Sequence, residues 1–364
     1  AISIESDEPS FIHTTGDTYA TYEKEEGTEP TSSELIDFAL ALQNELYATD
    51  SRVIDGTQAV AGYGVEKKAL YNSNGLDLED SSNFAFSYGM AVLSDNGEMY
   101  DGMEVVSGKL ENFNIEKIAK EAVKDAVDTI GAEPIPSGKY PVVFSNKVMA
   151  SMLATFGSIF SAEAAQKGLS LLKDKEGEQI ATDILTLTDD PMKEDALVKC
   201  TFDGEGVATY KKNVIENGKF ITLLHNLKTA AVAGVKTTGN GSKGSYASNV
   251  GISPYSFYIN PVSGSLEDLM QEAGNGVYIT SVQGMHAGAN AITGDFSLAA
   301  SGFEIVDGKK GAPVKSITVS GNFFSLLKDI VRIGEDLKFN PFSFGATRCG
   351  SPSVLIKEMT IAGK

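Results

Sequence analysis

The chain has 364 residues, enough for about two domains of ~150 residues each, and its 42% hydrophobic and 22% charged residues are ordinary for a globular protein. Its formal net charge of −19 excludes the basic footprint that direct binding to nucleic acid requires. The two cysteines, Cys200 and Cys349, exclude a disulfide framework and fit a reducing compartment, so we expect a cytoplasmic protein.

A membrane partner is not expected. The longest uncharged apolar run, residues 148–162, has 15 residues, fewer than the roughly 20 that cross a bilayer, and it predicts a buried helix instead. The first residues carry neither the basic nor the apolar stretch of a signal peptide. Because the chain does not begin with Met, we expect it to start inside a longer natural chain.

Two helices are predicted in the first part of the chain. Thr31 is followed three residues later by Glu34, the pattern of a capping box, and apolar residues then recur at helical spacing. Residues 115–130 form a second amphipathic pattern that ends at Gly131. Strands are predicted there at residues 59–70, 84–93 and 99–106. Asn96 and Gly97 join the last two strands, since Asn-Gly tolerates the positive φ angles of a tight hairpin turn.

The Pro- and Gly-rich residues 132–138 predict a domain boundary that separates residues 1–135 from residues 136–364. The second domain reads mostly as strand and turn. Its predicted strands are residues 140–144, 198–210, 277–282, 301–306, 314–319 and 354–361. Its predicted helices are residues 147–172, a short helix capped by Ser265, and residues 322–333. The predicted fold class is therefore α+β: a layered N-terminal α+β domain followed by a β-rich C-terminal domain with a few helices.

Motifs for common catalytic chemistry are weak. The three histidines, His13, His225 and His286, are far apart, and no pair has the spacing that places two imidazoles on one helical face. A metal site assembled from distant residues stays open. No Gly-x-Ser-x-Gly elbow for a nucleophilic serine occurs.

Two further patterns have plain explanations. Residues 239–244 match G-x-G-x-x-G, but the residues after them do not read as the helix that a dinucleotide site requires, so we expect a flexible glycine loop. Cys349 follows Arg348, whose charge could favour a reactive thiolate. No histidine lies nearby in sequence to act as a base, and a structural cysteine is favoured.

Residues 284–303 are the most informative segment. Small residues and glycines dominate it, which lets the backbone approach a neighbour closely. Together with residues 237–241, 313–322 and 348–363, this segment resembles the TldD/PmbA family, whose members are known as modulators of DNA gyrase and as metalloprotease components. The resemblance runs from about residue 31 to the end of the chain.

The family has two branches, and the resemblance favours the second. The TldD branch carries a His-Glu-x-x-x-His helix and a late Cys that bind a metal, expected to be zinc. The PmbA (TldE) branch lacks them and pairs with TldD in a heterodimer that degrades unfolded peptides. Here the matching positions are Ala154, Thr155 and Ile159, which cannot build a zinc-activated water, and Cys349 falls later than the ligand Cys. The resemblance thus implies no metal or cofactor in this chain, and zinc only in a TldD-like partner.

We therefore expect a non-catalytic subunit that helps to hold an extended peptide for that partner. Whether the chain homodimerises when alone stays open. Peptides can pair with exposed strand edges, and the groove candidates are Asn290, Thr293, Gly294, Asp295 and Arg348. Turn capping and local hydrogen bonding are the competing interpretation of these residues. Two alternatives stay open: an independent peptidase that uses Cys349 or an unrecognised metal site, and a non-enzymatic protein that binds DNA gyrase or a related partner.

Overall fold

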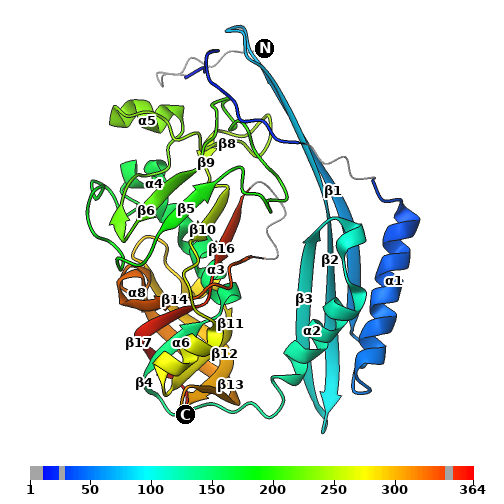
Figure 1. The fold of residues 1–364 in the computed structure, drawn as a ribbon. Coiled ribbons are helices and arrows are strands. Elements are labelled where there is room, and N and C mark those ends of the chain that lie inside the picture. Colours follow the sequence, from blue (N-terminus) through cyan, green and yellow to red (C-terminus); the bar gives the residue numbers. More distant parts are fainter. Residues whose placement is uncertain (1–10, 24–28, 341–346) are drawn as a thin grey trace.

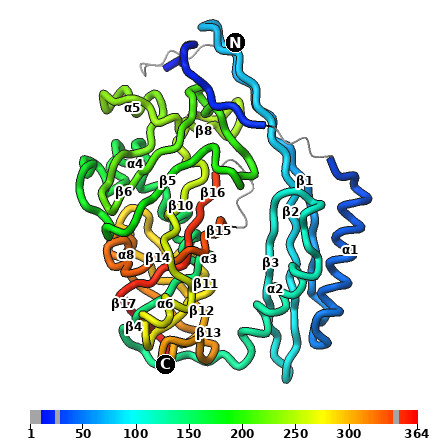
Figure 2. Tube along the Cα trace, in the orientation of Figure 1, coloured from blue at the N-terminus to red at the C-terminus, as the bar shows by residue number. Residues whose placement is uncertain are grey.

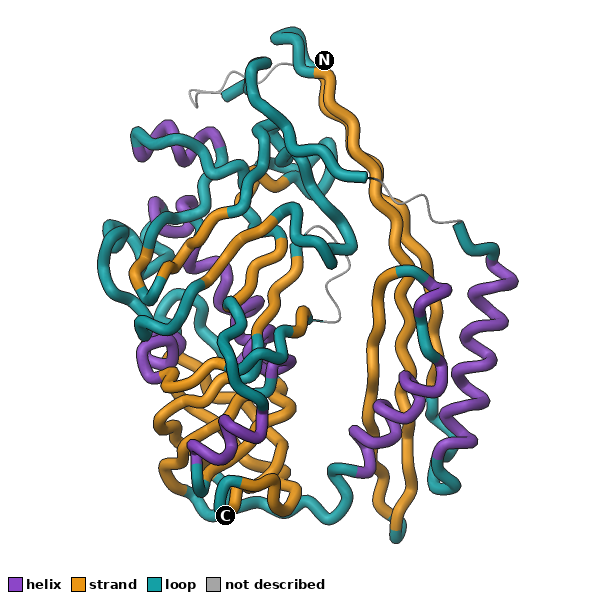
Figure 3. The backbone as a smooth tube through the Cα atoms, in the orientation of Figure 1, coloured by secondary structure: helices purple, strands orange, loops and turns teal. Residues whose placement is uncertain are grey.

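The computed structural model describes residues 11–23, 29–340 and 347–364 (Figure 1). In the N-terminal part, three antiparallel strands form a sheet in the order β1-β2-β3, with two helices packed on one face (Figure 3). The elements are α1 Ser32–Thr49, β1 Gln58–Tyr71, β2 Asp77–Asp95, β3 Glu98–Gly108, a 3-10 turn at Leu110–Asn112, and α2 Ile115–Val127.

Local signals form these elements as predicted. The capping box between Thr31 and Glu34 is present at the start of α1. Asn96 and Gly97 have φ angles of +49° and +85°, so both residues of the β2–β3 turn adopt the primed-turn conformation. At Gly102 in β3, a Cβ atom would overlap the main chain of α2, so glycine is needed for the helix to reach the sheet.

The C-terminal part contains two six-stranded sheets and a short two-stranded one. The first sheet has the order β13-β12-β11-β4-β17-β14 and closes on itself, because β13 also pairs with β17. The second has the order β15-β16-β10-β5-β6-β7. The strands are β4 Gly138–Phe144, β5 Leu187–Asp190, β6 Lys212–Glu216, β7 Lys219–Phe220, β8 Gly241–Ser242, β9 Gly251–Ile252, β10 Ser256–Ile259, β11 Gly276–Gln283, β12 Asp295–Val306, β13 Lys309–Asn322, β14 Ile330–Ile333, β15 Lys338–Phe339, β16 Arg348–Ser351 and β17 Val354–Ala362.

Helix α3 lies between these two sheets and beside β15 and β16 (Figure 2). Its apolar side chains belong to the largest core cluster, and Phe156 stacks on Phe323 with ring centroids 4.6 Å apart. The helices of this part are α3 Asn146–Phe156, a 3-10 turn at Gly157–Phe160, α4 Ala162–Gln166, α5 Leu227–Ala233, α6 Leu266–Ala273, α7 Met285–Gly288 and α8 Phe323–Asp329.

The α+β fold class is confirmed, but three predicted elements of the C-terminal part differ. Residues 147–172 do not form one helix, because α3 ends at Phe156 and Ser161 caps a new helix, α4. The helix predicted at residues 322–333 stops at Asp329, and its last residues pair with β17 as strand β14. In both stretches apolar residues continue past the end of the helix, so their presence does not mark the break.

The strand predicted at residues 198–210 is also wrong. This segment forms turns with a single β-bridge between Phe202 and Ala208. The buried carboxylate of Asp203 accepts hydrogen bonds from the main-chain N–H groups of Glu205 and Val207, at 2.8 and 3.0 Å. These local bonds replace a strand ladder, as Asp side chains do in turns.

The long β1–β2 hairpin connects the two parts of the chain. Lys68 Nζ donates to the Phe202 carbonyl at 2.6 Å, and Phe84 joins a small buried cluster with Cys200 and Tyr255. Tyr19 Oη, from the segment that precedes α1, donates to the Gly206 carbonyl at 2.8 Å. Among the described residues, no helix is both long and apolar enough to cross a membrane.

A buried ion pair in the second sheet provides a test of the fold. Lys212 Nζ lies 3.1 Å from Asp189 Oδ2, and their side chains are 5% and 0% exposed. Lys212→Met leaves the Asp189 carboxylate buried without a cation, so we expect the free energy of unfolding to fall by about 3–5 kcal/mol. Urea denaturation measures the loss.

The neighbouring Lys211 is the matched control. It pairs with Asp190 at 3.2 Å, but its side chain is 61% exposed. Lys211→Met should cost less than about 1 kcal/mol, because water screens an exposed pair. Equal losses in the two variants would contradict the structural role given to Asp189 and Lys212.

Candidate functional site

A cleft lies between the N-terminal sheet and the C-terminal part, and it consists of two cavities. The hairpin cavity, of about 600 Å³, is lined mainly by β1, β2 and residues 194–199. The α3 cavity, of about 620 Å³, is lined mainly by β3, α3, β11 and β15. Ser107, Asp195 and Leu197 line both cavities, so the two meet at these residues.

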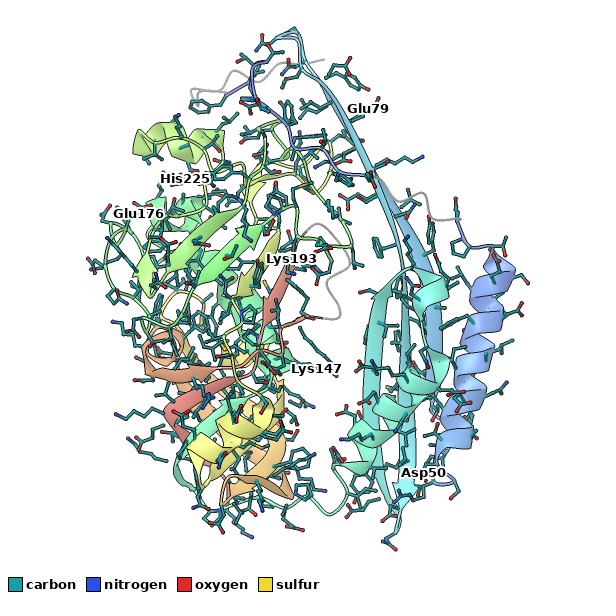
Figure 4. All side chains as sticks on the ribbon, in the orientation of Figure 1. Asp50, Glu79, Lys147, Glu176, Lys193 and His225 are labelled. Carbon is teal, nitrogen blue, oxygen red and sulfur yellow. The ribbon has the colours of Figure 1, made fainter. Side chains whose placement is uncertain are left out.

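Charged groups cross the α3 cavity. Lys147 of α3 and Glu104 of β3 form an ion pair with Nζ and Oε2 2.9 Å apart, which joins the two parts of the chain. Lys147 and Lys193 both lie on the side of the C-terminal part that faces the N-terminal sheet (Figure 4). Burial raises the pKa of Asp125, which lies beside this pair on α2.

Strand β3 presents an open edge to this cavity. Among the described residues it pairs only with β2, and Met103, Val105 and Ser107 line the cavity. The N–H of Met103 donates to the Asp125 carboxylate at 3.2 Å instead of to β2. Because N–H and C=O directions alternate along an antiparallel strand, the main-chain groups of Val105 and Ser107 also point away from β2. An extended segment can pair with such an edge.

Arg348, a predicted groove residue, lies in the wall of the α3 cavity. Its guanidinium donates to the Asp195 carboxylate and to the Asp195 carbonyl, both at 2.9 Å, and to Ser256 Oγ at 3.0 Å. The guanidinium carbon lies 3.7 Å from the centroid of the Phe339 ring. Burial lowers the pKa of Arg348, and the Asp195 charge opposes that shift.

The other groove candidates lie elsewhere and form a turn. The Asn290 side chain accepts from the N–H groups of Ile292 and Thr293, and Gly294 has a φ angle of +83°. Hydrogen bonds from Asn322 and Thr293 hold the pKa of Asp295 below its usual range. These residues do not line the α3 cavity. Strand β12, which follows the turn, pairs with β13 along its length and with β11 from Ala299 onward, and Ala289 forms a β-bridge to Phe296 near its start.

The positions expected to hold a metal carry no suitable ligands. Ala154 is exposed at the end of α3, whereas Ile159 lies beyond the helix, is 1% exposed and belongs to the core. Thr155 Oγ1 lies 2.9 Å from both the Ser151 carbonyl and Met285 Sδ. The Thr155 hydroxyl therefore links α3 to the glycine-rich segment. The hydrocarbon side chains of Ala154 and Ile159 have no lone pair for zinc. The residues at these positions do not fit a metal.

Other residues of the types that bind metals are not grouped into a site in the described part of the chain. Within residues 11–23, 29–340 and 347–364, no three His, Cys, Asp or Glu side chains are grouped so that they could hold a metal ion. His13 pairs with Asp17, His286 lies in α7, and His225 is buried, which lowers its pKa.

Cys349 is poorly placed to act as a nucleophile. It lies in β16 beside Phe257 of β10 and is 5% exposed. Burial raises the pKa of its thiol to about 12. The thiolate is the reactive species, so Cys349 is an inert thiol at neutral pH. The neighbouring Arg348 does not reverse this, because its guanidinium is bound to Asp195.

Sequence reasoning missed most of the cleft. Glu104, Lys147, Lys193 and Asp195 belong to no motif and read as charges on a solvated surface. Their partners are 43 residues away for the Lys147–Glu104 pair and 153 residues away for the Arg348–Asp195 pair. The predicted hairpin strand at residues 99–106 and the groove candidate Arg348 are the sequence predictions that fall in this region.

Comparisons with known proteins match this architecture. The PmbA/TldA metallopeptidase central domain matches residues 25–130, and the C-terminal domain of the same family matches residues 137–363. The metalloprotease PmbA of Escherichia coli O157:H7 is 27% identical over 92% of this chain and 71% of its own length. An uncharacterized protein of Methanocaldococcus jannaschii is 32% identical over 81% of this chain and 69% of its own length.

Solved structures show the same fold. A Thermotoga maritima protein described as a modulator of a DNA gyrase aligns with a TM-score of 0.89 and 37% identity, over 97% of this chain and 80% of that one. TldE from Thermococcus kodakarensis aligns with a TM-score of 0.89 over the same shares of the two chains, and its 24% identity supports a likeness of fold alone. The matched domains cover most of the sequence. The chain therefore belongs to the PmbA/TldA metallopeptidase family.

Proposed function

We propose that this chain is a non-catalytic, PmbA/TldE-like subunit of a TldD-type metalloprotease, and that it holds an unfolded peptide while its partner supplies the zinc. The observation that carries the proposal is the set of side chains at the end of α3. Ala154 and Ile159 offer no ligand atom, and the Thr155 hydroxyl is engaged by Ser151 and Met285. Activating water needs a metal with an open coordination position, which these residues do not create.

The cleft supports the peptide-holding part of the proposal. The outward-facing main-chain groups of Val105 and Ser107 lie in the wall of the α3 cavity. Across the cavity, the side chains of Val282 and Phe339 supply apolar contact area. A strand edge supplies main-chain hydrogen bonds to an extended peptide, and pockets beside the edge receive its side chains.

The decisive experiment is copurification from the native cell combined with metal analysis. We expect the chain alone to contain far less than one zinc per molecule and to hydrolyse no unfolded peptide. With a copurified His-Glu-x-x-x-His protein, hydrolysis should appear, and a chelator should abolish it. Plasma emission spectroscopy and a casein-peptide assay measure the two quantities.

Three outcomes would contradict this assignment. Stoichiometric zinc in the isolated chain, or chelator-sensitive hydrolysis by it, would make it an independent metallopeptidase. Recovery of DNA gyrase without any metalloprotease subunit would favour a binding protein of another kind. The control is the same preparation of the partner alone, which shows what this chain adds to the activity.

Val105→Pro tests pairing with the edge of β3. Proline removes an N–H that points away from β2, so the β2–β3 ladder keeps its hydrogen bonds. One lost hydrogen bond should weaken the binding of a labelled extended peptide by about three- to tenfold. Fluorescence anisotropy with the full chain measures the dissociation constant.

Val105→Ala is the matched control, because it shortens the side chain but keeps the N–H group. Its dissociation constant should stay closer to the wild-type value than that of Val105→Pro. If both variants bind alike, the peptide does not pair with the main chain at this position.

The cysteine peptidase alternative has its own test. Burial raises the pKa of Cys349 to about 12 and that of Cys200 to about 11, so iodoacetamide at pH 8 should leave both thiols of the folded chain unmodified. Both should react once urea unfolds the protein, as mass spectrometry can count. Rapid alkylation of Cys349 in the folded chain would revive the nucleophile hypothesis.

A further inference from the structure

Residues 191–200, called here the 191–200 loop, form a closed loop between β5 and β6. The N–H of Cys200 donates to the Pro191 carbonyl at 3.1 Å, which joins the two ends. Both end residues are buried, whereas Glu194 and Asp195 at the tip are exposed. Compact surface loops of this size with adjoining ends are often functional.

The tip of the 191–200 loop lies where the two cavities meet. Asp195 and Leu197 line both the hairpin cavity and the α3 cavity, and Ser107 of β3 does so from the opposite wall. Leu197 packs against the cluster that contains Phe84 and Tyr255. Because the tip lies between the hairpin cavity and the α3 cavity, its position determines whether the two cavities are separate or continuous.

Two cations hold the Asp195 carboxylate. Oδ1 lies 2.9 Å from Arg348 Nη2 and 2.8 Å from Lys193 Nζ. Burial opposes ionisation of this carboxyl, but the two cations prevail and hold its pKa below the usual range. The carboxylate is thus charged at neutral pH, and its side chain is 60% exposed.

The cationic side of this contact is built into the fold. The Arg348 side chain is only 8% exposed, starts from β16 between β10 and β15, and is fixed by Ser256 and the Phe339 ring. Lys193 Nζ lies 5.5 Å from the centroid of the Tyr258 ring. A planar guanidinium held in this way is preorganised for a carboxylate.

We propose that Arg348 and Lys193 are a receptor for a carboxylate of the bound peptide, and that Asp195 occupies this receptor when no peptide is present. The proposal rests on the peptide-holding function proposed above. A buried guanidinium needs an anionic partner, so Asp195 leaves only when another carboxylate replaces it. The exchange keeps the charge of the receptor constant and frees the loop tip from between the two cavities.

The receptor therefore selects acidic ligands. A neutral amide cannot take over from Asp195, because it would leave two cations with one weak acceptor. Lys147, another cation on this side of the cleft, is already paired with Glu104. The carboxylate can come from the C-terminus of the peptide or from a Glu side chain.

Three forms of one acetylated, fluorescent decapeptide test the proposal: a neutral form with a C-terminal amide, the same sequence with a free C-terminus, and an amidated form with one internal Glu. Binding is measured by anisotropy with the full chain, alone and with its metalloprotease partner. We expect at least one acidic form to bind about tenfold more tightly than the neutral form, as a charge-assisted hydrogen bond provides. The form that gains identifies the source of the carboxylate.

The other results separate the two proposals. Equal binding of all three forms would overturn the carboxylate receptor and leave the peptide-holding function intact. Binding of none of the forms, alone or in the complex, would overturn both.

Asp195→Asn tests the exchange itself. Removing the internal occupant should tighten the binding of the preferred acidic peptide by about tenfold and leave the neutral peptide unchanged. Weaker binding of the acidic peptide would mean that Asp195 does not compete with it, and would overturn the proposal. Glu194→Gln is the matched control, since it removes the same charge from the adjacent residue, which forms no ion pair among the described residues.

Arg348→Gln should abolish the preference for the acidic form. If that variant does not fold, Lys193→Met gives the same information, because the Lys193 side chain is 20% exposed and is not part of the core. An unchanged acidic preference in Lys193→Met and in any folded Arg348 variant would place the carboxylate elsewhere.

Discussion

The burial of α3 between the two large sheets of the C-terminal part is the interaction on which the rest of this structure depends. Its apolar side chains pack into the main core, and the Phe156 ring stacks on Phe323 of α8. The opposite face presents Lys147, Ser151 and Thr155, spaced four residues apart on one side of the helix. That face forms a wall of the α3 cavity, binds β3 through Glu104, and contacts Met285 of the glycine-rich segment.

The same helix carries the positions on which the proposed lack of a metal site depends. A metal site of the His-Glu-x-x-x-His type needs an imidazole at the first and at the last position of the motif, five residues apart. Here α3 ends at Phe156, and the residue at the last ligand position, Ile159, lies in the following 3-10 turn with its side chain in the core. The side chains at these two positions therefore offer zinc no ligand atom, and the α3 cavity lies beside the same helix.

The sequence predicted those elements that short-range forces determine. Thr31 and Glu34 cap α1, and the Asn96–Gly97 turn adopts its positive φ angles, because the interacting groups are neighbours in the chain. Prediction failed where the choice depends on distant partners, as for residues 330–333, which become a strand only because β17 lies beside them. Arg348, a predicted groove contact, lines the α3 cavity, but no local pattern shows that its counter-ion is Asp195.

The α3 cavity has a different balance of acidic and basic residues from the chain as a whole. The chain has 49 acidic and 30 basic residues, yet the α3 cavity is lined by three cations, Lys147, Lys338 and Arg348, and by three acids, Glu104, Asp125 and Asp195. The acidic excess therefore lies outside this cavity, where it repels an anionic ligand only over a screened distance of about 8 Å at physiological ionic strength. Inside the cavity, a ligand carboxylate that replaces Asp195 changes neither the local charge nor the number of paired cations. Selection between ligands then depends on the geometry of Arg348 and Lys193, because the net charge of the chain acts on all anionic ligands alike.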